Sequence, residues 1–186
     1  MKKILILDFG IFHKEEFLGC FKSLNAECKI VDHTISVEEI IKENPAGIIL
    51  SGSSDHVYDV LHRECDREIL AMAIPILGVC YGHQLIHHFL GGKVERKNSE
   101  FGLIETKHND SDLFKDVPEE FLSSMSHYDQ VTEMAPGFIA TSYTDDCMYA
   151  SSENTYDRLY TVQFHPERPG FEYGIKILEN FVNICE

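Results

Sequence analysis

The residues of this chain with the clearest capacity for chemistry begin with a cysteine between two glycines. The segment Gly78-Val79-Cys80-Tyr81-Gly82 follows an apolar run at residues 75–77 and precedes a helix-like segment. A nucleophile flanked by small residues at a strand-to-helix junction is typical of a nucleophile elbow, here with Cys in the serine position. The N-terminal end of the following helix favours the thiolate form of Cys80 over the thiol.

A histidine and a glutamate stand far downstream, where a second apolar strand-like run ends. The motif Gln163-Phe164-His165-Pro166-Glu167 offers a general base and a carboxylate that orients it. Together with Cys80 these residues predict acyl transfer through a thioester. By itself, Cys80 also fits a small buried hydrophobe beside tightly packed glycines. The His–Glu motif at another strand end favours the nucleophile.

Acyl transfer also needs hydrogen-bond donors for the oxyanion of the tetrahedral intermediate. The backbone N–H of Tyr81, directly after the nucleophile, is one predicted donor. A backbone N–H from the turn Gly52-Ser53 is the other.

The first half of the chain alternates short apolar runs with helix-like segments. Ser36 and Glu39 form a capping box that opens one of these helices. Such alternation predicts an α/β fold, a doubly wound and mostly parallel sheet with helices on both faces. The expected strands are residues 3–7, 28–31, 47–50 and 76–79, and the expected helices are residues 13–24, 36–43, 65–72 and 81–90.

Three of these strands end in residues suited to a site. Asp8-Phe9-Gly10, Ser51-Gly52-Ser53 and Cys80 follow the first, third and fourth strands. Reactive groups in doubly wound folds gather where such strands end. We therefore expect these segments to meet in one crevice.

The second half predicts a small β-rich extension and then a closing helix. We find no internal repeat or linker, so residues 1–186 are expected to form a single domain. The expected strands are residues 103–107, 137–142, 148–152 and 159–164, with the helix at residues 171–185.

Composition narrows the classes of function. A net charge of −15 argues against a nucleic-acid partner, because phosphate contacts need clustered Lys and Arg. No apolar stretch approaches the roughly 18 residues of a membrane helix. The six cysteines form no C-x-x-C pair, which suits reduced thiols, and residues 1–8 read as a first strand rather than a signal peptide. We expect a cytoplasmic protein without a membrane partner.

Three histidines lie on the helix after the nucleophile. His83 and His87 have the i, i+4 spacing of zinc ligands, and His88 follows. Without a carboxylate partner nearby in the sequence, these side chains are expected to pack rather than bind metal. No metal and no cofactor is predicted.

The motifs around Cys80 and His165 resemble those of the class I (triad) glutamine amidotransferases, over essentially the whole chain. Within that family the chain is most similar to the glutaminase subunit or domain of the GMP synthase branch. Supporting segments are residues 47–52, 100–102, 112–114 and 125–131. The resemblance implies that L-glutamine is hydrolysed to glutamate and ammonia. It further implies that ammonia passes to a separate ATP-dependent synthetase subunit, similar to the ATP-pyrophosphatase of GMP synthases.

The resemblance also implies a substrate pocket. Gln84 and the segment Ser126-His127-Tyr128-Asp129 would line the glutamine site. His127 and Asp129 would additionally face the partner protein.

Several positions depart from the family pattern, and two of them concern the oxyanion hole and the pocket. The family usually has Gly-Gly-Pro where this chain has Gly52-Ser53-Ser54, and the second glycine presents an oxyanion N–H. Ser53 resists positive φ by roughly 1 kcal/mol or more, so we expect an oxyanion hole that is either mis-set or needs the partner in order to form. Tyr128 replaces a residue that is often small and is expected to narrow the pocket.

Two other functions remain open. One is a hydrolase of γ-glutamyl amides or peptides that uses the same three residues and delivers no ammonia. The other is a catalytically silent regulatory protein, for which Ser53 and Tyr128 are the supporting substitutions.

Overall fold

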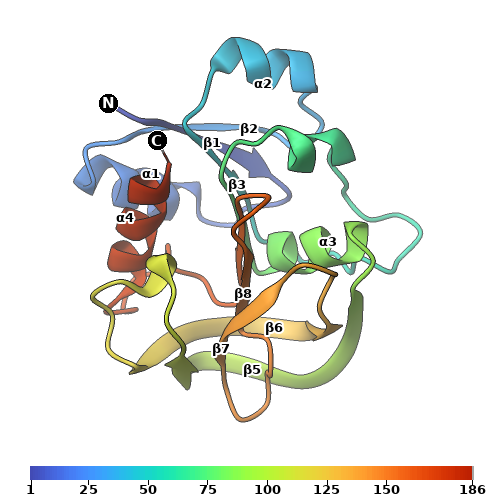
Figure 1. The fold of residues 1–186 in the computed structure, drawn as a ribbon, viewed down its shortest axis with the longest axis vertical. Helices are drawn as coiled ribbons and strands as arrows, with labels where there is room; N and C mark the ends of the chain where they lie inside the picture. The colour runs from blue at the N-terminus through green and yellow to red at the C-terminus, as the bar shows by residue number, and fades with distance from the viewer. Residues whose placement is uncertain (186) are drawn as a thin grey trace.

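The computed structural model describes residues 1–185 and is organised around a nine-stranded sheet (Figure 1). The strand order is β2-β1-β3-β4-β9-β8-β7-β5-β6. The first five strands in this order pair in parallel, and the later pairs are antiparallel. The predicted α/β fold, with a parallel core and a β-rich second half, is confirmed.

Four of the five parallel strands are short apolar runs that are buried on both faces, whereas β2 lies at the edge of the sheet and is partly exposed. Alternate side chains of the first strand point to opposite layers: Ile4 and Ile6 join one core, and Leu5 and Leu7 join the other. The parallel strands are β1 (Lys3–Asp8), β2 (Glu27–Asp32), β3 (Gly47–Leu50), β4 (Ile76–Val79) and β9 (Leu159–Val162).

Helices cover both faces of this parallel sheet, as predicted. The helices α1 (Lys14–Ser23) and α4 (Gly174–Ile184) pack on one face. On the other lie α2 (Val37–Glu43), the 3-10 helix η1 (Arg67–Ala71) and α3 (Tyr81–Phe89). Among the described residues, no helix combines the length and the apolar character that crossing a membrane requires.

Local signals explain where two of these helices begin and end. The Ser36 side chain accepts from the Glu39 N–H and the Glu39 side chain accepts from the Ser36 N–H, so the predicted capping box is present. The prediction of an α-helix at residues 65–72 is wrong. Only the shorter 3-10 helix η1 forms there. Asp66 caps its start, and Ala73, with φ of 57°, turns the chain away before Pro75.

The antiparallel half contains a long hairpin that the sequence patterns predicted poorly. Residues 120–133 were not expected to form a strand, and the first half of the preceding strand was also missed. Residues 123–130 are rich in Ser, His, Asp and Gln, which strands disfavour, and pairing with the neighbouring strand satisfies their backbone. The antiparallel strands are β5 (Lys93–His108), β6 (Glu120–Glu133), β7 (Ile139–Tyr143) and β8 (Ser151–Asn154), with the 3-10 helix η2 (Asp112–Phe114) between β5 and β6.

Candidate active site

Cys80 occupies a strained backbone conformation between β4 and α3. Its φ of 52° and ψ of −103° lie outside the regions that non-glycine residues favour, at a cost of about 1–3 kcal/mol. The Cys80 N–H donates to the carbonyl of Val162 at 2.8 Å, and its own carbonyl accepts from the Gln84 N–H at 3.1 Å. These bonds fix the turn between the parallel sheet and the helix.

Two glycines make this turn possible. A Cβ on Gly78 would lie 2.6 Å from the carbonyl oxygen of Gly82. A Cβ on Gly82 would lie 2.2 Å from the carbonyl oxygen of Leu50. Both contacts are with backbone, which cannot give way as a side chain can. The helix therefore lies against β3 and β4 only because neither residue has a side chain.

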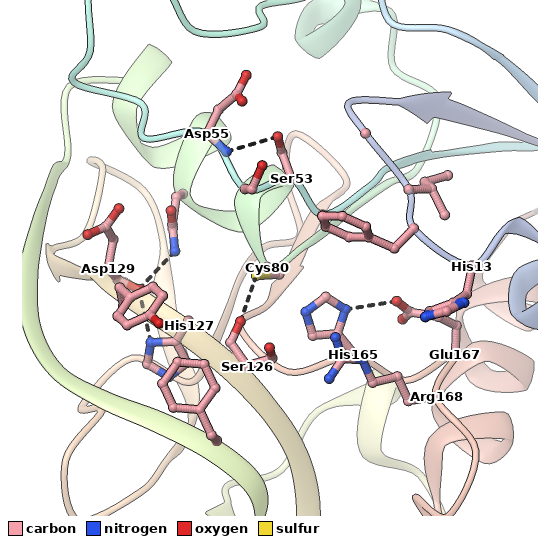
Figure 2. Close-up of a pocket in the computed structure, with 18 of the residues that line it drawn as sticks. His13, Ser53, Asp55, Cys80, Ser126, His127, Asp129, His165, Glu167 and Arg168 are labelled. Carbon is pink, nitrogen blue, oxygen red and sulfur yellow. Dashed lines mark hydrogen bonds and ion pairs between the residues drawn. The ribbon is translucent and has the colours of Figure 1, made fainter.

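His165 and Glu167 follow β9, the strand next to β4 in the sheet. The His165 N–H donates to the carbonyl of Ser124 at 2.9 Å, which ties this turn to β6. The imidazole Nδ1 of His165 lies 2.8 Å from Oε1 of Glu167. Figure 2 shows the ring between the Cys80 sulfur and the Glu167 carboxylate. The structure thus brings together the three residues that the sequence motifs indicated as nucleophile, base and orienting carboxylate.

Charge holds a proton on His165. Burial alone would lower the pKa of the imidazole, but the negative charges of Cys80 and Glu167 raise it to about 10. The imidazolium therefore lies beside the Cys80 sulfur (Figure 2). Burial raises the pKa of the other five thiols, which are Cys20, Cys28, Cys65, Cys147 and Cys185.

A second contact with the sulfur comes from Gln163, whose side chain is fully buried. Its Nε2 donates to Sγ of Cys80 at 3.5 Å, and its Oε1 accepts from Nε2 of Gln84 at 3.1 Å. Gln84 Nε2 also donates to the carbonyl of Asp129 at 2.9 Å. Because Gln84 occupies the oxygen of the Gln163 amide, the amide NH₂ points at the sulfur. Gln163 belongs to the downstream sequence motif, but no role was predicted for it.

The segment that carries Ser126, His127, Tyr128 and Asp129 is part of β6, not a loop. Sγ of Cys80 lies 3.8 Å from the carbonyl oxygen of Ser126. His127 is buried, with Nδ1 3.0 Å from the Asp129 carbonyl and Nε2 2.9 Å from Glu100. These contacts hold the His127 side chain inside the protein.

Asp129 is likewise buried, although the resemblance implied that it would face a partner. Its carboxylate pairs with Nδ1 of His56 and accepts from the Tyr58 hydroxyl at 3.0 Å. His56 and Tyr58 were not singled out from the sequence. No local motif marks them, because both belong to the irregular residues 51–65 between β3 and η1.

Gly52 and Ser53, the predicted oxyanion donors, begin this irregular segment. A Cβ on Gly52 would lie 3.0 Å from Cε1 of His165, so the turn passes directly beside the imidazole. Ser53 is not among the described residues with positive φ, and its hydroxyl accepts from the Asp55 N–H at 3.1 Å. Tyr81, the other predicted donor, is the first residue of α3, where backbone N–H groups have no partner within the helix.

These residues surround a cavity of about 290 Å³ that opens beside Cys80. Tyr128 is part of its lining, with a half-exposed ring 5.0 Å from that of Phe101 and 4.8 Å from the Arg96 guanidinium. The lining includes nearly every predicted site residue, namely Gly52, Ser53, Cys80, Gln84, Ser126, His127, Tyr128, Asp129, His165 and Glu167.

The fold and the site define a class of protein. It is an α/β protein in which a cysteine lies on the tight turn after a parallel strand, beside a His–Glu pair, and supplies the reactive thiol. The family model for glutamine amidotransferase class-I matches residues 5–185. The chain belongs to this family.

Two relatives show which members of this family the chain is similar to. It is 40% identical over 191 residues to GMP synthase [glutamine-hydrolyzing] of Streptococcus pneumoniae (strain ATCC 700669 / Spain 23F-1). It is 42% identical over 185 residues to the protein of the same name from Macrococcus caseolyticus (strain JCSC5402). These matches cover 100% and 98% of this chain but only 37% and 36% of the two relatives.

A solved structure matches over nearly its full length. The crystal structure of a protein described as a putative GMP synthase subunit, from Thermoplasma acidophilum, superposes with a TM-score of 0.86 at 26% identity. The match covers 100% of this chain and 94% of that one. The similarity to GMP synthases that the sequence motifs indicated is therefore confirmed.

Proposed function

We propose that this chain hydrolyses L-glutamine to L-glutamate and ammonia through a thioester on Cys80. The observation that carries the proposal is the imidazole of His165 between the Cys80 sulfur and the Glu167 carboxylate, beside a cavity of about 290 Å³ (Figure 2). A thiolate, a base and an orienting carboxylate are the groups that acyl transfer requires.

In the first half of the reaction the Cys80 thiolate attacks the side-chain amide carbon of glutamine, and a C–S bond forms. The imidazolium of His165 gives its proton to the departing nitrogen as the C–N bond breaks, which releases ammonia. In the second half, water attacks the thioester while His165 takes its proton. The C–S bond then breaks, glutamate leaves and the thiolate is restored.

We assign the oxyanion of both tetrahedral intermediates to two backbone donors. One is the N–H of Tyr81 at the start of α3, where the helix dipole also favours negative charge. The other comes from the Gly52–Ser53 turn, which lies next to His165. We place the glutamine substrate against Gln84 and residues 126–129, which line the cavity.

We further propose that the ammonia passes to an ATP-dependent synthetase on a separate chain, of the ATP-pyrophosphatase kind found in GMP synthases. The chain matches just over a third of its GMP synthase relatives, and the Thermoplasma acidophilum protein, described as one subunit of such an enzyme, matches nearly end to end. On this proposal residues 1–186 are a single amidotransferase domain, and six free cysteines suit a reducing cytoplasm.

The test measures glutamate release from L-glutamine by the purified chain, alone and with candidate synthetases. We expect turnover that Cys80→Ala abolishes and that Cys28→Ala, a matched change of a half-buried thiol, leaves intact. Faster turnover of γ-glutamyl anilides than of glutamine would instead support a γ-glutamyl hydrolase. Failure of diazo-oxo-norleucine to label Cys80 under any condition would support a catalytically silent protein.

A further inference from the structure

Three side chains that bind metals well meet outside the Cys80 cavity. The imidazoles of His62 and His88 and the carboxylate of Glu64 each offer one ligand atom, and these atoms lie within 4.8 Å of one another. His62 and Glu64 belong to the irregular residues 51–65, and His88 belongs to the last turn of α3, beside which that segment runs (Figure 1). The two imidazole rings meet edge to face with centroids 6.0 Å apart.

The surroundings of His62 prepare it to accept a cation. Its Nδ1 lies 2.5 Å from the carbonyl oxygen of Asp59, so this nitrogen carries the hydrogen and Nε2 keeps its lone pair. Nε2 lies 2.9 Å from Oε1 of Glu64, which is also an acceptor. A second proton on the ring or a bound metal ion would satisfy both atoms. A backbone carbonyl that fixes the ring tautomer is a common support for metal-bound histidine.

We propose that His62, Glu64 and His88 bind a divalent transition metal of the zinc class. Two imidazole nitrogens and one carboxylate oxygen form a ligand set that zinc accepts, and the fourth position would be left to water. Mg²⁺ and Ca²⁺, which prefer oxygen ligands, fit this set poorly. The Glu64 side chain is 43% exposed, so the ion can enter from solvent.

One neighbouring side chain weakens metal binding and therefore offers a further test. Nη2 of Arg67 lies 3.7 Å from the carboxylate of Glu64, and its positive charge would repel the ion. Replacement of Arg67 by Met should therefore tighten metal binding, whereas loss of a ligand should weaken it.

Metal binding would connect the irregular residues 51–65, part of which line the cavity, to α3, the helix that begins after Cys80. Residues 52–56 line the cavity, and residues 62 and 64 lie further along the same irregular segment. A single hydrogen bond, from the Tyr81 hydroxyl to the Arg63 carbonyl, already joins this segment to α3. A metal would add a second connection near the other end of α3.

The experiment titrates Zn²⁺ into the full chain carrying Cys80→Ser, so that the reactive thiol cannot bind the ion. We expect one Zn²⁺ per chain, at least tenfold weaker binding for His62→Asn and for His88→Asn, and tighter binding for Arg67→Met. His33→Asn, a change of a histidine outside the cluster, should leave the affinity unchanged. Circular dichroism without metal shows whether each variant folds.

Two further measurements identify the atoms that bind the metal and test whether the metal stabilises the irregular segment against α3. The Co²⁺ absorption spectrum should show nitrogen and oxygen ligands without sulfur-to-metal charge transfer. Zn²⁺ should slow hydrogen exchange in residues 54–66 of the Cys80→Ser chain but not when His88→Asn is added. Any one of three results would overturn the proposal. These are a lack of saturable binding, a spectrum that shows sulfur ligands, and an unchanged affinity in a folded His88→Asn variant.

Discussion

Gly82, in the first turn of α3, lies against the end of β3 so closely that a Cβ would stand 2.2 Å from the Leu50 carbonyl oxygen. This contact sets the distance between the helix and the sheet, and therefore the position of Cys80 between them. The same backbone contact leaves no room for any other residue type.

We predict that Gly82→Ala displaces the helix and removes the reactivity of Cys80. The cost should reach several kcal/mol, because backbone must move to admit the methyl group. Urea unfolding and labelling by diazo-oxo-norleucine check both effects. Gly19→Ala is the matched control, since nothing lies within 4 Å of its Cβ in α1, and it should raise stability by about 0.5–1 kcal/mol.

Selective alkylation at Cys80 is the second prediction. The sulfur of Cys80 lies beside the imidazolium of His165, whereas burial raises the pKa of the other thiols, that of Cys28 and Cys65 to about 12. Iodoacetamide at neutral pH should therefore modify one site per folded chain, and peptide mapping identifies it. His165→Asn should slow this modification by about tenfold or more, because it removes the positive charge beside the sulfur. Equal labelling of several cysteines in the folded chain would contradict the assignment.

The pH dependence of stability provides a third prediction. The pKa of His165 rises from an ordinary value of 6.5 to about 10 in the folded chain. Such a group adds stability that is fully present below pH 6.5 and is lost as the pH rises to about 10. The difference in unfolding free energy between the parent and His165→Asn should shrink over this range by at least about 1.4 kcal/mol. Urea titrations at both ends measure it, and a constant difference would count against the charged pair.

Local sequence signals were sufficient to predict the strands of the parallel half, most of its helices and the residues around Cys80. Apolar runs such as residues 47–50 are buried on both faces, and the glycines at 78 and 82 leave the room that the turn at Cys80 needs. The meeting of Gly52 with Cys80 followed from the rule that parallel strands end at one edge of a sheet, whereas His165 was joined to Cys80 by their chemistry as base and nucleophile.

The rest of the site depends on contacts between distant segments that no local pattern records. Strand β6 has a polar sequence and exists because it pairs with β5. The pairing of His56 with Asp129 joins an irregular segment to this strand across 73 positions in the chain. Tertiary contacts of this kind decide the structure where intrinsic preference is weak or opposed.

The last prediction concerns Gln163, which we regard as a positioning residue for the sulfur. Its amide donates to Sγ of Cys80, and Gln84 holds the amide in that orientation. Gln163→Glu keeps the shape but replaces the donor with a carboxylate that repels the thiolate. A hydrogen bond to a charged group contributes about 1.5–3 kcal/mol, so Cys80 alkylation at neutral pH should slow by about 10- to 100-fold.

A shift of the alkylation profile of Cys80 to higher pH would separate this role from a structural one. Gln163→Met removes the donor without adding charge and should produce a smaller shift in the same direction. Gln84→Met leaves the donor in place but frees the Gln163 amide to rotate, so its effect should be smaller than that of Gln163→Met. If all three variants lower the melting temperature yet keep the pH profile of alkylation seen in the parent, the Gln163 amide contributes to packing alone. The reactivity of the Cys80 sulfur then depends on His165.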